Sequence, residues 1–148
     1  MQKVPLHQHC QSLVEQKLMA VETALREAKG AAHEETKSSA GDKYETSRAM
    51  MHLEQEKLAR QRAEVLKLRK VLDQINPYQT SGQVSLGSLV ESSRGMFYLA
   101  VSLGAIVWEG KTYFVISAVA PIGQALRGLR AGDTFAFNGD TVTIRRVW

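Results

Sequence analysis

Hydrophobic residues in the first part of the chain recur at alternating steps of four and three positions, with Glu, Lys and Gln between them. This spacing places them on one stripe of an α-helix and is typical of a coiled-coil seam. Pro5 suits the first turn of such a helix, where its missing N–H is not needed. We therefore predict a helix over residues 5–37, with a seam formed by Val14, Leu18, Val21, Leu25, Ala28 and Ala32.

A second stretch repeats the spacing with Met51, Leu58, Val65, Leu68, Leu72 and Ile75. Glu54 and Gln61 fall on seam positions and are expected to loosen the packing there. Pro77 ends this helix, because proline cannot continue the backbone hydrogen-bond pattern. The link Ser38-Ser39-Ala40-Gly41 is short enough to require an antiparallel hairpin. Arms of about thirty residues extend roughly 45 Å, and small seam residues near the link predict a slim tip.

The composition changes after the second helix, because Gly, Val, Thr, Ser and Phe dominate from Gln83 onward. Short apolar segments predict strands over residues 84–90, 96–101, 106–108, 113–118, 134–137 and 141–147, with one helix over 121–129. Glu109-Gly110-Lys111 and Asn138-Gly139-Asp140 predict tight hairpin turns. We expect an α+β fold with a helical hairpin domain over residues 1–77 and a β-rich domain over residues 78–148.

The net charge of +4 is too modest for a protein that holds duplex DNA by itself, so nucleic-acid contact is expected to be assisted. Cys10 is the single cysteine and cannot form an internal disulfide, and the chain opens without a secretion-signal series. Both features predict a cytoplasmic location. The longest apolar run, residues 96–108, is shorter than the ~20 residues that span a bilayer. It predicts buried strands.

The segment 116–133 reads Ile-Ser-Ala-Val-Ala-Pro-Ile-Gly-Gln-Ala-Leu-Arg-Gly-Leu-Arg-Ala-Gly-Asp and resembles the signature of the C-terminal domain of Gre transcription factors. Ala120 stands where the family has a serine. Residues 84–90, Val-Ser-Leu-Gly-Ser-Leu-Val, are similar to the first strand of the same domain. The matched signature positions keep the family's order and spacing: Pro121, Ile122, Ala125, Leu126, Gly128, Gly132 and Asp133.

This resemblance implies an FK506-binding-protein-like β fold behind an N-terminal coiled coil, and RNA polymerase as the partner. In the family, the C-terminal domain docks at the rim of the polymerase secondary channel and the coiled coil reaches inward toward the catalytic magnesium. Pro121, Ile122, Ala125 and Leu126 are then the expected polymerase-docking residues. The resemblance implies an accessory transcription elongation factor rather than an enzyme. We expect a monomer that binds no cofactor alone and contacts nascent RNA only indirectly.

At the predicted tip, Gly41-Asp42-Lys43-Tyr44-Glu45 is similar to the family's glycine-aspartate-x-x-glutamate. The resemblance makes Asp42 and Glu45 the expected catalytic residues, which share Mg²⁺ with the polymerase while it cleaves backtracked transcripts. The same spacing also fits a capping box, in which the two side chains only satisfy free N–H groups at the start of a helix.

A second register of the tip is also open. In that register Tyr44 and Arg48 match the family's tyrosine and arginine, and Lys37 and Ala40 stand where the carboxylates belong. The family's asparagine-alanine-glutamate-tyrosine, which follows the tip, is missing here. A factor with this tip would still bind the channel, and would inhibit or modulate the polymerase without cleavage.

Basic residues cluster on the second predicted helix, where residues 57–70 hold six basic residues and one acidic residue, a local excess of +5. Lys57, Arg60 and Lys67 are candidate contacts to RNA or to acidic polymerase surfaces. A solvated helix face is the alternative. No P-loop, dinucleotide motif or Ser-His-acid arrangement is present. Two further alternatives are a prolyl isomerase or chaperone, by analogy with FK506-binding folds, and a coiled-coil adaptor.

Overall fold

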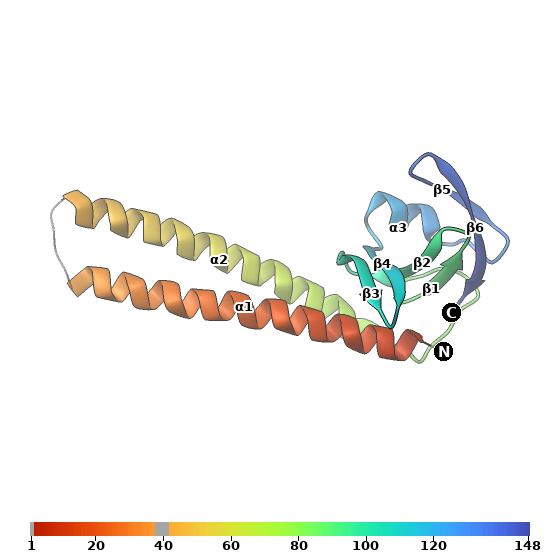
Figure 1. Ribbon diagram of the computed structural model, residues 1–148, viewed down its shortest axis with the longest axis horizontal. Coiled ribbons are helices and arrows are strands. Elements are labelled where there is room, and N and C mark those ends of the chain that lie inside the picture. Colours follow the sequence, from red (N-terminus) through yellow and green to blue (C-terminus); the bar gives the residue numbers. More distant parts are fainter. Residues whose placement is uncertain (1, 38–41) are drawn as a thin grey trace. The chain divides into compact units, whose positions relative to one another are not determined.

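The computed structural model describes residues 2–37 and 42–148, and the side chains of residues 2–31 and 45–148. The α+β fold predicted from the sequence is confirmed: two long helices precede the strands and a single short helix lies among them (Figure 1). The elements in chain order are α1 (Lys3–Lys37), α2 (Asp42–Gln74), β1 (Leu89–Ser92), β2 (Gly95–Ala100), β3 (Gly104–Trp108), β4 (Lys111–Ser117), α3 (Pro121–Leu126), β5 (Thr134–Phe137) and β6 (Asp140–Val147).

Contacts divide the chain into two compact units. The hairpin unit consists of residues 12–69, which are most of α1 and α2. The β unit consists of residues 1–11 and 70–148, and so contains the strands, α3, the start of α1 and the end of α2. The domain division at residues 77 and 78 stays a prediction.

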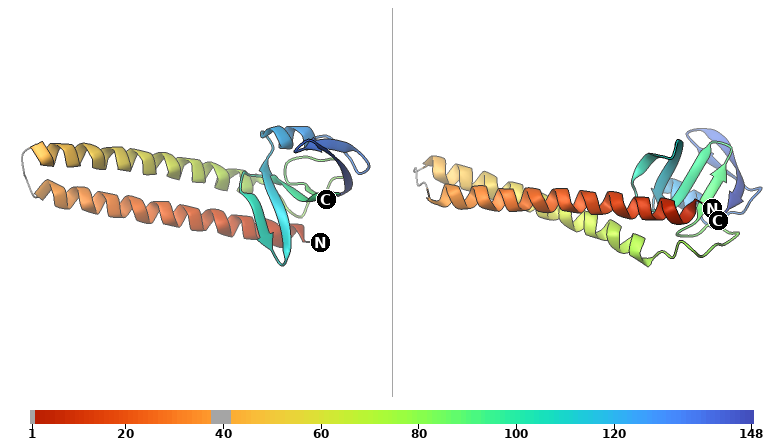
Figure 2. Two further views of the ribbon diagram at one scale, coloured as in Figure 1. Left: turned by 45° about the horizontal axis from the view of Figure 1, so that its top comes forward. Right: turned by 60° about the horizontal axis from the view of Figure 1, so that its bottom comes forward.

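The two helices of the hairpin unit run antiparallel and lie side by side in every view (Figures 1 and 2). Leu18, Val21 and Leu58 are buried between them, as the predicted seam requires. Ala32 and the link 38–41 lie outside the residues whose side chains are described. Polar contacts between described residues join the helices of this unit: Arg69–Glu15 at 3.4 Å, Arg62–Glu22 at 3.6 Å, and Gln55 Nε2 to the Ala28 carbonyl at 3.5 Å.

The polar seam positions of α2 differ from the prediction. Glu54 and Gln61 are exposed rather than buried in the seam, and Gln61 borders a groove between the two helices. Gln55, Arg62 and Arg69 reach α1 instead. The apolar residues of α2 recur every seven positions, and the second seam position between them could be either of two adjacent residues, such as Glu54 or Gln55. Only the partners on α1 decide which residue faces the other helix.

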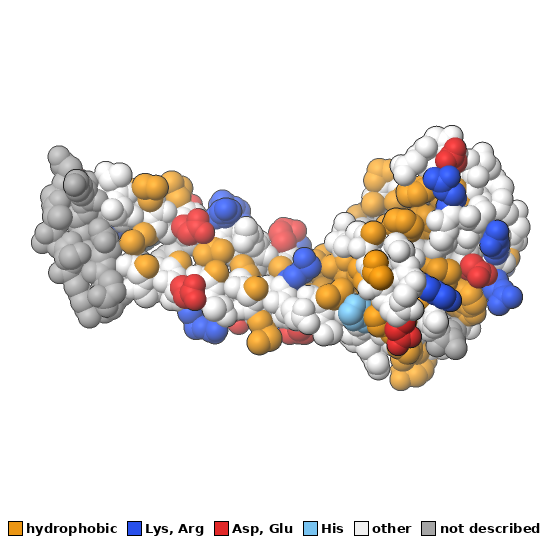
Figure 3. Space-filling view, in the orientation of Figure 1, with side chains coloured by type: hydrophobic (Ala, Val, Ile, Leu, Met, Phe, Trp, Pro, Cys, Tyr) orange, Lys and Arg blue, Asp and Glu red, His pale blue; other side chains and the backbone are white. Residues whose placement is uncertain are grey.

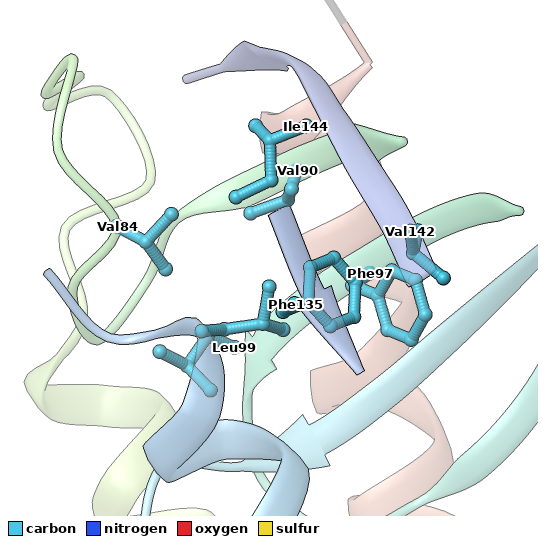
Figure 4. Close-up of a cluster of buried hydrophobic side chains, with 8 residues drawn as sticks. Val84, Val90, Phe97, Leu99, Phe135, Val142 and Ile144 are labelled. Carbon is cyan, nitrogen blue, oxygen red and sulfur yellow. The ribbon is translucent and has the colours of Figure 1, made fainter. Parts of the chain in front are cut away.

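The strands of the β unit form one six-stranded sheet in the order β3-β4-β2-β1-β6-β5. β2 and β4 pair in parallel, and the other neighbours pair antiparallel. Phe97 at the centre lies opposite Val90 on one side and Phe114 on the other. This row faces a hydrophobic core (Figure 4) whose buried members are Val84, Val90, Phe97, Leu99, Leu126, Phe135, Val142 and Ile144.

The opposite face of the central strands carries Tyr98 and Tyr113, which are fully buried. The Tyr98 hydroxyl forms a hydrogen bond with Nδ1 of His7 in α1, and the Tyr113 hydroxyl donates a hydrogen bond to the Gln2 side chain. Side chains alternate between the two faces of a strand, and both faces are covered here. The prediction of buried strands within the apolar run is therefore confirmed for β2. It is wrong for the edge strand β3, where Ile106 is buried but Val107 is exposed. Within the described part of the chain, no helix is long and apolar enough to cross a membrane.

The predicted strand over residues 84–90 is wrong at its start, because β1 begins only at Leu89. Gly87 has φ +90° and interrupts the extended backbone. Val84 instead exchanges hydrogen bonds with the turn after α3: its N–H donates to the Leu129 carbonyl and its carbonyl accepts from Gly128, both at 2.8 Å. This pairing also explains why α3 ends at Leu126, earlier than the predicted residue 129.

Both predicted hairpin turns are confirmed. Glu109 and Gly110 have φ values of +48° and +76°, and Asn138 and Gly139 have φ values of +51° and +81°. Positive φ at both central residues defines the type I′ turn that suits the twist of two-residue hairpins. The first turn joins β3 to β4, and the second joins β5 to β6.

Candidate functional site

The segment that carries the C-terminal motif folds into α3 and the turns that follow it. Pro121 occupies the first turn of α3, and both Pro121 and Ala125 are exposed. Ile122 is half-buried against the core, and Leu126 is completely buried within it. Of the four expected docking residues, the structure therefore presents Pro121 and Ala125 at the surface, while Leu126 supports α3 from the core.

The remaining motif residues shape the backbone. Gly132 has φ +96°, and its N–H donates to the Ile144 carbonyl at 2.8 Å. Gly128 has φ +85° in the turn that holds Val84. The Asp133 carboxylate accepts a 2.8 Å hydrogen bond from the Arg130 N–H, which closes the turn before β5. Glycine adopts these conformations without strain, so this part of the motif has a folding role.

Gly123 is a residue that the sequence reasoning missed. It is buried in α3, and a Cβ built on it would lie 2.0 Å from the carbonyl oxygen of Ser117 at the end of β4. The helix therefore packs directly on backbone. A glycine inside a predicted helix is the signal that could have found it, since glycine there is unfavourable without a packing reason.

Ala120 is the N-cap of α3, with φ −67° and ψ 154°, and it makes no side-chain cap hydrogen bond. We expect Ala120→Ser to raise the free energy of unfolding of the β unit by about 1 kcal/mol, because a serine hydroxyl can accept from a free N–H of the first turn. Denaturant unfolding measures the gain. Ala125→Ser, on the exposed face of the same helix, is the matched control and should give no gain. Equal effects of the two substitutions would contradict capping.

The expected catalytic pair lies at the start of α2, which begins at Asp42. The side chain of Asp42 lies outside the described residues, whereas Glu45 is described and exposed. Residues three apart on a helix lie on neighbouring positions of one surface. Among the residues whose side chains are described, no group of three His, Cys, Asp or Glu could hold a metal ion. Two carboxylates from this chain would supply only part of a magnesium coordination shell, which takes six ligands.

The basic residues of α2 do not form one uniform charged face. Lys67 pairs with Glu64 on its own helix at 3.0 Å. Arg62 pairs with Glu22 of α1, and Arg69 pairs with Glu15 of α1. The local excess of +5 counts residues of α2 alone and does not include these two acids. Lys57 and Arg60 are exposed, and neither has an ion-pair partner among residues with described side chains. Lys70, the last basic residue of the cluster, is also exposed and lacks such a partner, so these three cations of the cluster are available to a partner.

Lys57 and Arg60 also border a shallow groove of about 740 Å³ between the helices. Val21, Leu58 and Val65 line the groove, and Lys17 lies on its α1 side. Figure 3 shows the same mixed character along the hairpin unit, where hydrophobic side chains lie between acidic and basic ones. Such a surface offers apolar contact and positive charge together.

A cluster of titratable groups is buried in the β unit. His7 Nδ1 lies 2.6 Å from the Tyr98 hydroxyl, and burial raises the pKa of the Cys10 thiol to about 12. Burial is also the main cause that lowers the pKa of His7; the Leu72 backbone hydrogen bond and Asp73 oppose it, and Lys3 adds to it. His9 instead stacks on Trp108 with ring centroids 6.1 Å apart. These side chains stabilise the packing of α1 on the sheet.

A lowered His7 pKa gives the β unit a predictable pH dependence. The unfolded chain binds the proton more readily, so stability is complete above about pH 6.5 and is lost as the pH falls from there toward the folded pKa. We expect the free energy of unfolding to decrease between pH 7 and pH 5, and this decrease to shrink in His7→Gln. The exposed His52 provides the control, because His52→Gln should keep the dependence. An identical decrease in all three proteins would contradict the role of His7.

Comparisons with known proteins are sparse. No protein-family profile matches the chain, and no curated protein sequence matches it. Among solved structures, the chain is similar to one titled "Structure of the transcription factor Gfh1", with 20% sequence identity over 92% of this chain and 90% of that chain, and a TM-score of 0.37. A likeness this weak is no argument for a shared function.

Proposed function

We propose that this protein is a transcription elongation factor of the Gre type that binds RNA polymerase. The observation that carries the proposal is the motif of residues 121–133. Its residues fold as one continuous surface element, with α3 fixed on the core by Leu126 and with turns formed by Gly128 and by Gly132 with Asp133. The motif therefore encodes a rigid surface element. In the Gre family, which this motif resembles, the corresponding element docks on the polymerase.

The long hairpin supports the same proposal. A helix of 35 residues, such as α1, is about 52 Å long at 1.5 Å per residue. The hairpin unit is only two helices thick, and the ion pairs Arg62–Glu22 and Arg69–Glu15 connect the two helices. Under the proposal this hairpin enters the secondary channel, and the exposed cations Lys57 and Arg60 contact acidic polymerase surfaces or nascent RNA on the way.

At the tip, we propose that Asp42 and Glu45 are ligands of the magnesium ion of the polymerase. Carboxylate oxygens are hard ligands that suit Mg²⁺, which usually keeps several water molecules and takes one or two carboxylates. Two carboxylates from this chain meet that requirement when the polymerase supplies the rest. The magnesium would support cleavage of a backtracked transcript by the polymerase, and the factor would contribute charge at the site rather than an active site of its own.

A second candidate is a factor that binds the polymerase and modulates it without cleavage. The departure of the tip from the family pattern favours it, since residues after Glu45 lack the family's asparagine-alanine-glutamate-tyrosine. In the second register, Lys37 and Ala40 take the carboxylate positions and no magnesium ligand remains. Both candidates require binding to the polymerase and differ in the cleavage assay alone.

Binding to purified core RNA polymerase tests the proposal. We expect association at micromolar factor and displacement by a competitor for the secondary channel. If neither occurs, the transcription proposal is wrong. Prolyl isomerase turnover in the absence of polymerase binding would favour the chaperone alternative, and binding to other proteins alone would favour the adaptor.

The same binding assay measures how much the basic residues of α2 contribute to affinity for the polymerase. We expect the double substitution Lys57→Ala and Arg60→Ala to weaken polymerase binding roughly 2- to 30-fold at low salt, at 0.2–1 kcal/mol for each exposed charge contact. The loss should shrink at high salt because such contacts are screened. Lys67→Ala is the matched control: Lys67 already pairs with Glu64, so a smaller loss is expected. Unchanged affinity of the double variant would mean that this face is only solvated.

A further inference from the structure

The segment that connects α2 to β1 folds around a polar cavity of about 440 Å³ in the β unit. Its wall includes Lys3 at the start of α1, the hydroxyl residues Thr80, Ser81, Ser85 and Ser88, and the amides of Gln74, Asn76 and Gln79. Ile75 and Leu86 add apolar surface. None of the lining residues is acidic. A cavity of this size is within the range of small-molecule sites.

Lys3 is the only charged residue of this lining, and it is 2% exposed. Its ammonium donates to the Gln79 carbonyl at 2.6 Å. An ammonium group has three donors, so further donors remain for a ligand. No acidic side chain of the described residues forms an ion pair with Lys3. This lysine is a buried cation that lacks a counterion within the described chain.

Burial of a charge without a partner is costly, and proteins normally compensate it with an opposite charge or shift the group toward its neutral form. Burial does lower the pKa of Lys3. A bound anion would remove this cost, and the hydroxyl groups of Ser85 and Ser88 offer further polar contact. The cavity therefore has the charge and the size that an anionic ligand requires.

We propose that the cavity around Lys3 binds a small molecule through its oxyanion group, a phosphate or a carboxylate. Lysine binds such groups as a point charge, and charge-assisted hydrogen bonds are roughly twice as strong as neutral ones. The hydroxyl and amide groups of the wall suit the polar remainder of the ligand, and the absence of acidic lining residues disfavours cations. None of the lining residues belongs to the motif, the hairpin face or the tip, so ligand binding can be measured without the polymerase.

The test is an NMR titration of the isotope-labelled full chain with inorganic phosphate and, separately, with acetate, against sodium chloride at equal ionic strength. Each anion is taken to roughly 10 mM, which detects a Kd of about 1 mM. We expect saturable shifts in the backbone amides of Thr80, Ser81, Ser85 and Ser88. Saturation by phosphate alone identifies a phosphate ligand, and saturation by acetate alone identifies a carboxylate ligand.

Lys3→Gln is the decisive variant, because glutamine can still donate to the Gln79 carbonyl but lacks the charge. It should weaken binding about tenfold or more. Lys70→Gln, at an exposed lysine of the same unit, should bind as the parent does. Should Lys3→Gln not fold, the side-chain signals of Lys3 and Lys70 in the parent replace it, and only Lys3 should shift. Absence of saturation, equal binding by Lys3→Gln, or equal shifts of the two lysines would overturn the proposal.

Discussion

Gly123→Ala is expected to destabilise the β unit by about 3 kcal/mol or more, the upper part of the range for overpacked interiors. The added Cβ would lie 2.0 Å from the Ser117 carbonyl oxygen and 3.1 Å from the Ala118 carbonyl carbon. Both are backbone atoms, so no side chain can rotate away to make room. α3 would have to separate from β4, which would withdraw Leu126 from the core. Denaturant unfolding, followed by near-ultraviolet signals of the aromatic core, measures the loss.

Gly30→Ala supplies a control with the same chemical change. Gly30 lies in α1 on an exposed position of the hairpin unit, and a Cβ there meets nothing within 4 Å. Alanine is the better helix former, so this substitution should stabilise the hairpin unit by about 1 kcal/mol. The two substitutions should therefore have opposite signs. A loss below 1 kcal/mol for Gly123→Ala would mean that α3 is not held against the backbone of β4.

The second large effect is expected at the tip of the hairpin. If Asp42 and Glu45 hold the polymerase magnesium, Asp42→Asn and Glu45→Gln should each reduce stimulated cleavage of backtracked complexes roughly 100-fold, the loss typical when one preorganised electrostatic contact to a reacting centre is removed. Each substitution preserves side-chain shape and removes only the charge. Polymerase binding and helix content should remain nearly unchanged, because the proposed docking residues belong to the β unit.

The alternatives give different results in the same assay. If the pair only caps α2, these variants should leave cleavage unaffected and keep most of the stability, because Asn and Gln can still cap, whereas Asp42→Ala should cost about 1 kcal/mol. Cleavage that survives in the double variant would exclude these two residues as metal ligands. A parent protein that binds the polymerase and stimulates no cleavage would identify a modulator. Lys43→Gln, between the two carboxylates, is a control that should preserve cleavage.

Several features of the chain follow from local pattern. The repeat of Leu18, Val21 and Leu58 predicted the hairpin, because burial of an apolar stripe requires a partner helix. Asn138-Gly139 predicted its turn, because few residues accept positive φ. The predictions of the tip remain untested, because function there depends on side chains beyond the described residues and on a partner.

The sequence therefore predicted the two long helices, both hairpin turns and the alternation of strand faces, since each depends on residues that are near neighbours along the chain. Tertiary structure alone decided which polar residues cross the hairpin, why β1 starts at Leu89, and why Gly123 must be glycine. It also brought Lys3 to the connecting segment, 76 positions away at its contact with Gln79. These features depend on contacts between distant segments, and a local pattern carries no information about the partner that a side chain will meet.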